Sequence, residues 1–313
     1  MIAGMDTDGD GQILLYSSEE LKSWHYEGIL YKNHHEYGDM WECPDFFPLD
    51  EKYILIASPE YIKGDGSDFQ DGPGTVGLIG AYDRVEHKFI REHIQMLDYG
   101  MDFYAAQTVQ ALDGRRILIG WMEKFSNRPV PSDYEWYGMM TLPREMRIED
   151  GKLYMEPVRE LKNYYMNCVS YENIVLDGLV ELEGIRGRYL DMTIEVKAGE
   201  YEEFSVEVAA DENRKTVIRY TRGTSLLVID RALTGHEQDN AKIFSTGVSE
   251  RGGAIQIRII LDNCALEVYA NKGEKVMSAL VFTSENAVDI RFASKGKVIF
   301  DIKKNDLCLN EIF

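Results

Sequence analysis

Short runs in which apolar and polar residues alternate recur along the first half of the chain, and glycine- or aspartate-rich turns bound them. Four of these runs are Ile13–Tyr16, Tyr53–Ala57, Val76–Gly80 and Arg116–Gly120. A period of two residues is typical of β-strands, and long helical periodicity is absent. The glycine-rich residues 64–74 predict an irregular loop. Short strands separated by irregular loops favour propeller blades for this half.

The pattern changes after about residue 170, where the strands become longer and more regular. The clearest are Glu203–Val208, Ser225–Ile229, Ile255–Ile260 and Leu266–Tyr269. Strict alternation over several such strands favours a β-sandwich. The residues after Pro157 allow at most about two turns of helix and form a natural linker. We therefore predict an all-β chain with a partial β-propeller over residues 1–158, a linker over 159–170 and a C-terminal β-sandwich over 171–313.

The size of the first half predicts an incomplete propeller. A blade takes about 45–50 residues and a closed ring needs at least about four blades, so residues 1–158 supply about three. The run Met1–Gly4 reads as a strand with no turn before it. An unclosed propeller leaves unpaired strand edges, which promote aggregation. We expect the sequence to be a fragment that is truncated at its N-terminus.

Charge and cysteine content narrow the class of protein. The chain has 54 Asp+Glu against 34 Lys+Arg, a net charge of −20, which argues against a nucleic-acid partner. No apolar run approaches the roughly 18–20 residues that span a membrane. The opening residues lack the basic and apolar regions of a signal peptide. The four cysteines form no Cys-x-x-Cys pair, so we expect reduced thiols in a cytoplasmic protein.

Two stretches imitate metal sites without completing them. Residues 6–11 begin like an EF-hand loop, but its twelfth position is Ser17 instead of a bidentate Glu, so a hairpin turn is the simpler interpretation. His34 and His35 are adjacent and have no third ligand at a helpful spacing. The sequence predicts neither a metal site nor an organic cofactor.

The stretch Trp41-Glu42-Cys43-Pro44-Asp45 carries the clearest candidate chemistry. Glu42 lies between Trp and Cys-Pro, a partly apolar setting that suits a general acid. On composition alone, an ordinary turn carboxylate is the simpler interpretation. Three further motifs follow in order and change that view: residues 100–108 (GMDFYAAQT), 120–122 (GWM) and 141–145 (TLPRE).

Together these motifs resemble glycoside hydrolase family 32, the β-fructofuranosidases, which include invertases, sucrose-6-phosphate hydrolases, inulinases and levanases. Residues 257–274 are similar to the family's sandwich, with Asn263-Cys264-Ala265 where the family usually has Arg-Ser-Ser. The resemblance implies the C-terminal part of a five-bladed β-propeller followed by a β-sandwich. It also implies retaining hydrolysis of terminal β-fructofuranosyl bonds in sucrose, sucrose 6-phosphate or short fructans, without a cofactor.

By the same resemblance Glu42 is the general acid/base. The resemblance also implies supporting roles for other residues near it. Asp45 belongs to the acid/base motif, with turn capping as the alternative. Tyr104 and Gln107 are expected to face the pocket and hydrogen-bond Glu42, unless they only fill the blade. Trp121 is expected to stack on the sugar, with the blade core as the alternative. The expected substrate-binding residues are Asp45, Asp102, Tyr104, Gln107 and Trp121.

The sequence departs from the family in one respect that concerns catalysis. A retaining enzyme needs a second carboxylate roughly 5–5.5 Å from the first as nucleophile. The family supplies it from a Trp-Met-Asn-Asp-Pro-Asn-Gly motif, and an Arg-Asp-Pro motif binds fructose; neither occurs here, and both would lie upstream of Met1. We therefore expect little or no hydrolysis by the isolated chain.

Two other functions stay open beside that of a fructosidase fragment. The chain could be a non-catalytic carbohydrate-binding remnant, or one subunit of a split enzyme whose partner polypeptide brings the missing blades. A fructose-containing saccharide is the expected ligand in each case, and contacts through the sandwich could form a homodimer.

Overall fold

The computed structural model describes residues 2–66, 68–100, 102–123, 138–197, 199–234 and 242–308; Met1 and Met101, which belong to the motifs above, lie outside them. Strands hold 64% of the chain and helices 3%, so the predicted all-β class is confirmed. The chain divides into two compact units. The first comprises residues 1–98, 103–125 and 139–157, and the second comprises residues 99–102, 126–138 and 158–313.

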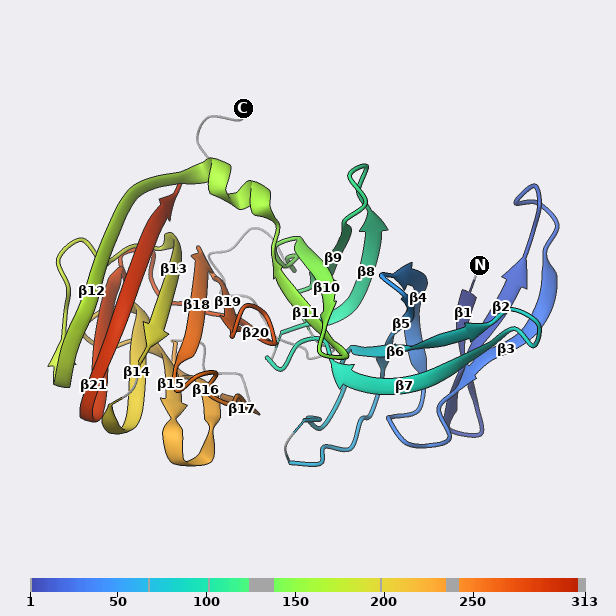
Figure 1. Cartoon of the computed structure of the whole chain (residues 1–313), viewed down its shortest axis with the longest axis horizontal. Helices are drawn as coiled ribbons and strands as arrows, with labels where there is room; N and C mark the ends of the chain where they lie inside the picture. The colour runs from blue at the N-terminus through green and yellow to red at the C-terminus, as the bar shows by residue number, and fades with distance from the viewer. Residues whose placement is uncertain are drawn as a thin grey trace. The chain divides into compact units, whose positions relative to one another are not determined.

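The first unit contains three antiparallel sheets within the described residues (Figure 1). Consecutive strands are neighbours in each sheet, which is the meander arrangement of a propeller blade. The first sheet holds β1 (Ile2–Thr7), β2 (Asp10–Ser17) and β3 (His25–Lys32); the second holds β4 (Trp41–Leu49), β5 (Lys52–Pro59), β6 (Val76–Asp83) and β7 (Lys88–Met96); the third holds β8 (Tyr104–Gln110), β9 (Arg116–Trp121), β10 (Arg144–Glu149) and β11 (Lys152–Pro157).

The stretch that imitates an EF-hand is the turn between β1 and β2. Thr7 faces Asp10 across the hairpin, and the two residues between them, Asp8 and Gly9, have φ values of +56° and +71°. Positive φ at both central positions is the requirement of a two-residue hairpin turn. The hairpin interpretation of this stretch agrees with the structure.

The second unit is a sandwich built from one continuous sheet of ten strands. The long strand β21 (Asp289–Leu307) connects the two layers, because residues 289–297 pair with β14 and residues 300–306 pair with β13. The strands β13 (Tyr189–Val196), β18 (Ile255–Asp262), β19 (Ala265–Ala270) and β20 (Lys275–Leu280) follow on one side, and β14 (Glu200–Ala210), β15 (Lys215–Thr221), β16 (Leu226–Leu233) and β17 (Ile243–Gly247) on the other.

Aromatic side chains from both layers meet in the core of this sandwich. Phe204 on β14 lies 5.1 Å from Phe300 and 6.5 Å from Phe292, measured between ring centroids, and both partners belong to β21. All three side chains are fully buried. The core is therefore fixed by the same strand that joins the layers.

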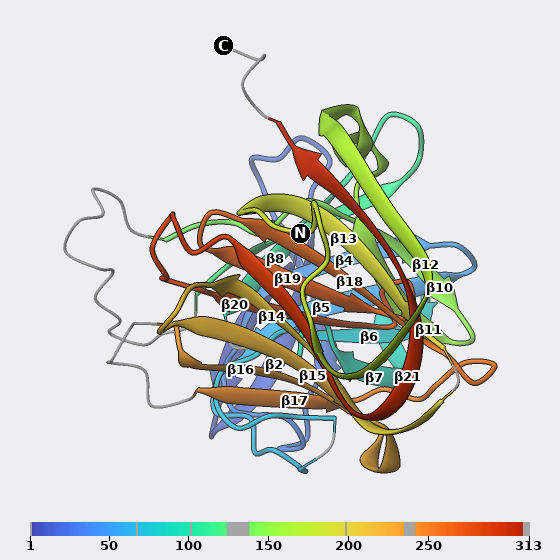
Figure 2. The ribbon, with the colours of Figure 1, turned by 90° about the vertical axis from the view of Figure 1, so that its left-hand side faces the viewer.

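One predicted boundary is wrong. The linker was predicted over residues 159–170, but β12 (Tyr165–Val180) already begins at Tyr165 and pairs with β21 from its first residue; only Arg159–Tyr164 forms a separate 3₁₀ helix, η1. The two strands run side by side (Figure 1 and Figure 2). Most side chains of β12 are exposed, and its register shifts three times, so the strand has no regular alternation that the sequence could reveal.

No helix within the described ranges is long and apolar enough to cross a membrane.

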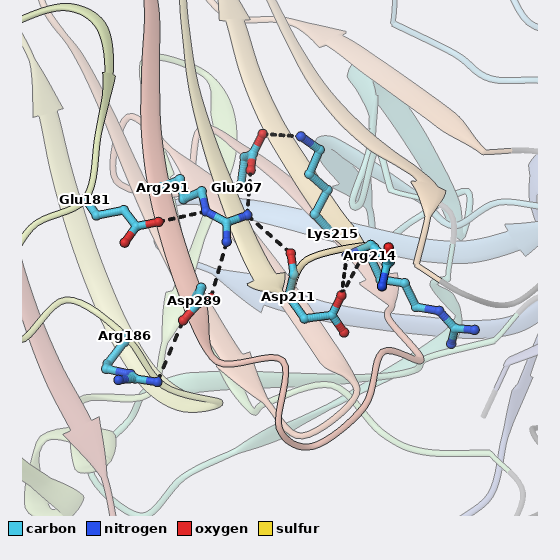
Figure 3. A network of polar contacts seen from close by, with 9 residues as sticks. Glu181, Arg186, Glu207, Asp211, Arg214, Lys215, Asp289 and Arg291 are labelled. Carbon is cyan, nitrogen blue, oxygen red and sulfur yellow. Dashed lines mark hydrogen bonds and ion pairs between the residues drawn. The ribbon is translucent and has the colours of Figure 1, made fainter.

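A charged network joins three segments of the sandwich around Arg291 (Figure 3). Its guanidinium donates to the Glu181 carboxylate at 2.8 Å, to the Asp211 carbonyl at 3.3 Å and to the Asp289 carboxylate at 3.3 Å. The Glu207 carboxylate lies 3.5 Å from the same group. Glu181 follows β12, Glu207 and Asp211 lie in and directly after β14, and Asp289 begins β21. One side chain therefore connects the ends of three strands.

We expect the Arg291→Met substitution to lower the free energy of unfolding by about 1–2 kcal/mol, because several weak, partly exposed ion pairs are lost together. Arg186→Met is the matched control: Arg186 is 66% exposed and contacts only the Asp289 carboxylate, at 3.7 Å, among the ion pairs described for it. Its expected cost is below about 0.5 kcal/mol. Urea denaturation of both variants measures these losses, and an equal loss in the free energy of unfolding for the two variants would contradict the prediction.

Candidate active site

Glu42 is the second residue of β4 and lies at a β-bulge. Glu42 faces Ser58 on β5, but the next paired residue, Asp45, faces Ile56, so Cys43 and Pro44 together oppose one residue. Cys43 has a φ of +46°, in the left-handed region. Pro44 has no amide hydrogen to lose at this break in the ladder. A bulge changes the direction of the side chains beside it, here that of Glu42.

The strand β8 carries a matching bulge. Tyr104 faces Trp121 on β9, and the next paired residue, Gln107, faces Ile119. Ala105, directly after Tyr104, has a φ of +53°. Each of the two strands therefore has a non-glycine residue in the left-handed region just after a predicted site residue. Strained backbone of this kind concentrates at functional sites.

The hydroxyl of Tyr104 contacts the Glu42 carboxylate. Its oxygen lies 3.0 Å from Glu42 Oε2 and 2.8 Å from the carbonyl oxygen of Ser58, and the single hydroxyl hydrogen is shared between these two acceptors. Tyr104 is 1% exposed. Burial, and then the negative charge of Glu42, raise the pKa of Tyr104 far above its ordinary value. The hydroxyl therefore stays a proton donor to Glu42 at any working pH.

Trp41 anchors the residue before Glu42. The indole is fully buried, and its Nε1 donates to the Tyr37 carbonyl at 2.8 Å. Its ring packs against Gly11 on β2, where an added Cβ would lie 2.2 Å from Trp41 Cδ1. Only glycine leaves room for the indole there, so the contact fixes the start of β4 on the first sheet.

Gln107 hydrogen-bonds backbone carbonyls and not the Glu42 carboxylate that the sequence suggested, and Asp45, which was expected to bind substrate, contacts Thr108. Gln107 Nε2 donates to the carbonyl of Cys43 at 2.8 Å and to that of Ala106 at 3.1 Å. Asp45 Oδ2 accepts the backbone amide of Thr108 at 2.9 Å and also the Thr108 hydroxyl. Asp45 thus bridges β4 to β8, and its expected substrate contact stays a prediction.

Trp121 lies at the end of β9, opposite Tyr104, and is half-buried. This places it beside the residue that contacts Glu42. Its expected stacking on a sugar ring stays a prediction.

Asp102 requires a correction. It is fully buried, and its carboxylate lies 2.6 Å from Arg231 NH1 and 2.8 Å from the amide nitrogen of Leu280. Residues 99–102 belong to the second unit, where an added Cβ on Gly100 would lie 2.1 Å from the Ser278 nitrogen. Asp102 therefore balances the charge of Arg231 inside the sandwich. Its closeness to Tyr104 in sequence hid the change of unit after residue 102.

Sequence reasoning missed three residues of this arrangement. Ser58 supplies a carbonyl to Tyr104, Thr108 supplies two donors to Asp45, and Arg116 places its NH2 atom 3.4 Å from Asp45 Oδ1. Thr108 follows Gln107 directly, and this adjacency was the available signal. Arg116 was included only as part of an alternating strand.

Models of known families match nearly the whole chain. The Glycosyl hydrolases family 32 N-terminal domain matches residues 1–157, and the family 32 C-terminal domain matches residues 160–306. These matches cover both units.

Individual relatives agree with the family models. A sucrose-6-phosphate hydrolase of Staphylococcus xylosus is 30% identical over 312 residues, which are 98% of this chain and 62% of the relative. The solved sucrose-6-phosphate hydrolase of Lactobacillus gasseri has a TM-score of 0.82 at 24% identity, with 98% of this chain and 65% of that chain covered. A GH32 beta-fructofuranosidase of Bombyx mori has a TM-score of 0.81 at 24% identity, with 98% and 62% covered.

This chain spans less than two thirds of the length of each of these relatives. The structural likeness supports the predicted architecture of a β-propeller followed by a β-sandwich. Because the two family models together account for residues 1–157 and 160–306, the chain belongs to glycosyl hydrolase family 32.

Proposed function

We propose that this chain carries the general acid/base half of a retaining β-fructofuranosidase, with Glu42 as the acid/base. The observation that carries the proposal is the Glu42 carboxylate at the β4 bulge, 3.0 Å from the buried Tyr104 hydroxyl. The proposed substrates are terminal β-fructofuranosyl bonds in sucrose, sucrose 6-phosphate or short fructans. The names of the Staphylococcus xylosus and Bombyx mori relatives support this substrate class.

The proposed chemistry has two steps. In the first, protonated Glu42 gives its proton to the glycosidic oxygen, the bond from that oxygen to the fructosyl carbon breaks, and a carboxylate nucleophile bonds to that carbon. In the second, ionised Glu42 takes a proton from water, and the hydroxide oxygen displaces the nucleophile. Tyr104 donates to the Glu42 carboxylate and holds it in place for both proton transfers.

The nucleophile is proposed to come from outside these 313 residues, because the sequence holds no Asn-Asp-Pro-Asn motif. A separate polypeptide that supplies it, a homodimer and a cytoplasmic location stay predictions. Trp121, half-buried and opposite Tyr104, is proposed to stack on the fructosyl ring or its leaving sugar.

Fructose release from sucrose and sucrose 6-phosphate tests this function in two proteins. One is the 313-residue chain, and the other is a fusion of this chain with the portion of the Staphylococcus xylosus relative outside the matched region. We expect the fusion to release fructose and the chain alone to release no more than its Glu42→Gln variant. An inactive fusion that still binds sucrose would favour a carbohydrate-binding remnant instead. Release by the chain alone that Glu42→Gln abolishes would contradict the missing nucleophile.

A further inference from the structure

Side chains join β4 and β8 at three places. Beside the contact of Tyr104 with Glu42, Gln107 binds the Cys43 carbonyl, and Thr108 binds the Asp45 carboxylate. Both strands belong to the first unit. We call the residues that make the other contacts the β4–β8 clamp. It comprises Cys43 and Asp45 on β4, Gln107 and Thr108 on β8, and Arg116 on β9.

We propose that the β4–β8 clamp is a positioning device for Glu42, with Gln107 and Asp45 acting through the backbone of Cys43 instead of binding substrate. The proposal rests on the function proposed above for Glu42. It assigns a role to two residues for which the sequence suggested direct contact with sugar or with the Glu42 carboxylate.

The conformation of Cys43 needs an external restraint. A residue other than glycine is unfavourable at a φ of +46° and keeps that conformation only when its surroundings fix it. The Gln107 amide meets this need from the neighbouring sheet, because it donates to the Cys43 carbonyl at 2.8 Å. Its second bond, to Ala106 at 3.1 Å, fixes the amide itself on the β8 bulge. The peptide that follows Glu42 is thus held from β8.

Asp45 fixes the other end of the bulge. Its Oδ2 accepts two bonds from Thr108, while Arg116 donates to the Thr108 hydroxyl at 2.6 Å and approaches Asp45 Oδ1 at 3.4 Å. The guanidinium carbon of Arg116 lies 3.8 Å from the centroid of the Phe47 ring, which limits its movement. The Arg116 guanidinium therefore balances the charge of the Asp45 carboxylate, and Thr108 orients the carboxylate toward β8. With both ends of the bulge held from β8, the backbone that carries Glu42 is fixed, and the side chain starts from one direction.

The thiol of Cys43 is a built-in reporter that requires no substrate. It is half-buried, and burial together with the charge of Glu42 raises the pKa of Cys43 above its usual value. Alkylation by iodoacetamide, read at the Cys43 peptide by mass spectrometry over a range of pH, measures both the access to this thiol and its pKa.

We expect Gln107→Met, which keeps the length of the side chain but removes the donor, to speed alkylation of Cys43 about fivefold at fixed pH, the factor for one lost hydrogen bond. Gln110→Met is the matched control, because Gln110 is an exposed glutamine on the same strand. It should leave the rate unchanged. Gln107→Lys retains a donor and should restore slow alkylation, and Thr108→Val tests the second contact should Gln107→Met fail to fold.

A second readout separates positioning from simple stabilisation. In the otherwise unchanged chain, Glu42→Gln should lower the pKa of Cys43 by removing a nearby charge. If the clamp positions Glu42, that shift shrinks when Gln107→Met or Thr108→Val is also present. The proposal would be overturned if the shift in the Cys43 pKa stayed as large in these double variants. It would also be overturned if Cys43 were alkylated at the same rate in Gln107→Met as in Gln110→Met. Because no substrate takes part, an inactive fusion would refute the proposed function without altering this result.

Discussion

The Asp98→Ala substitution should lower the free energy of unfolding of the first unit by about 3–5 kcal/mol, the largest stability loss that we expect from a single substitution. Asp98 and Arg144 are both fully buried, with 2.9 Å between Asp98 Oδ2 and Arg144 NH1. The guanidinium carbon also lies 4.9 Å from the centroid of the Phe103 ring. Removing the carboxylate takes the ion pair with Asp98 away from a buried arginine charge, and that charge cannot be hydrated without unfolding.

Urea denaturation measures this loss, and two further variants interpret it. Lys52→Met removes an exposed ion pair whose side chains are 41% and 46% exposed, and should cost less than about 1 kcal/mol. Replacing both partners, as Asp98→Leu with Arg144→Met, removes the buried charge as well and should recover most of the loss. A double variant as unstable as Asp98→Ala would contradict the argument from buried charge.

The Glu42→Gln substitution in the fusion protein should lower kcat/KM for sucrose by about 10²–10⁴-fold, because a glutamine amide can neither give a proton to the leaving oxygen nor take one from water. The shape of the site is kept, since the amide oxygen still accepts the Tyr104 hydroxyl. The matched control is Glu92→Gln, which neutralises a 46%-exposed carboxylate in the same unit. An equal loss of kcat/KM in both variants would show that Glu42 is not the acid/base.

The architecture could be predicted from the sequence where apolar runs are bounded by turn residues. The runs Tyr53–Ala57 and Ile255–Ile260 lie inside β5 and β18. β18 alternates between buried and half-buried positions over Ile255–Ile259, whereas β5 is buried at every position from Ile54 to Pro59. The beginning of β12 could not be predicted, because an exposed edge strand with repeated bulges carries no alternating pattern. Its pairing with β21 depends on residues more than a hundred positions away.

The site was predictable to the level of motifs but not of contacts. Glu42, Tyr104 and Gln107 meet at the β4 and β8 bulges, as the order of the motifs suggested. The distinction between contact with a carboxylate and contact with a backbone carbonyl depends on the left-handed Cys43, which a Cys-Pro sequence does not reveal. The buried ion pair of Asp102 could not be predicted for another reason, because its partner Arg231 lies far away in the sequence.

The assignment of Glu42 as acid/base is tested most directly by comparing two leaving groups in the fusion protein and its Glu42→Gln variant. Sucrose has a leaving oxygen that needs a proton, whereas an aryl β-fructofuranoside with an acidic phenol does not. The account predicts that the variant is nearly inactive on sucrose but releases a rapid burst of phenol, followed by slow turnover, since the fructosyl intermediate forms and then lacks a base. Equal losses on both substrates, without a burst, would contradict it.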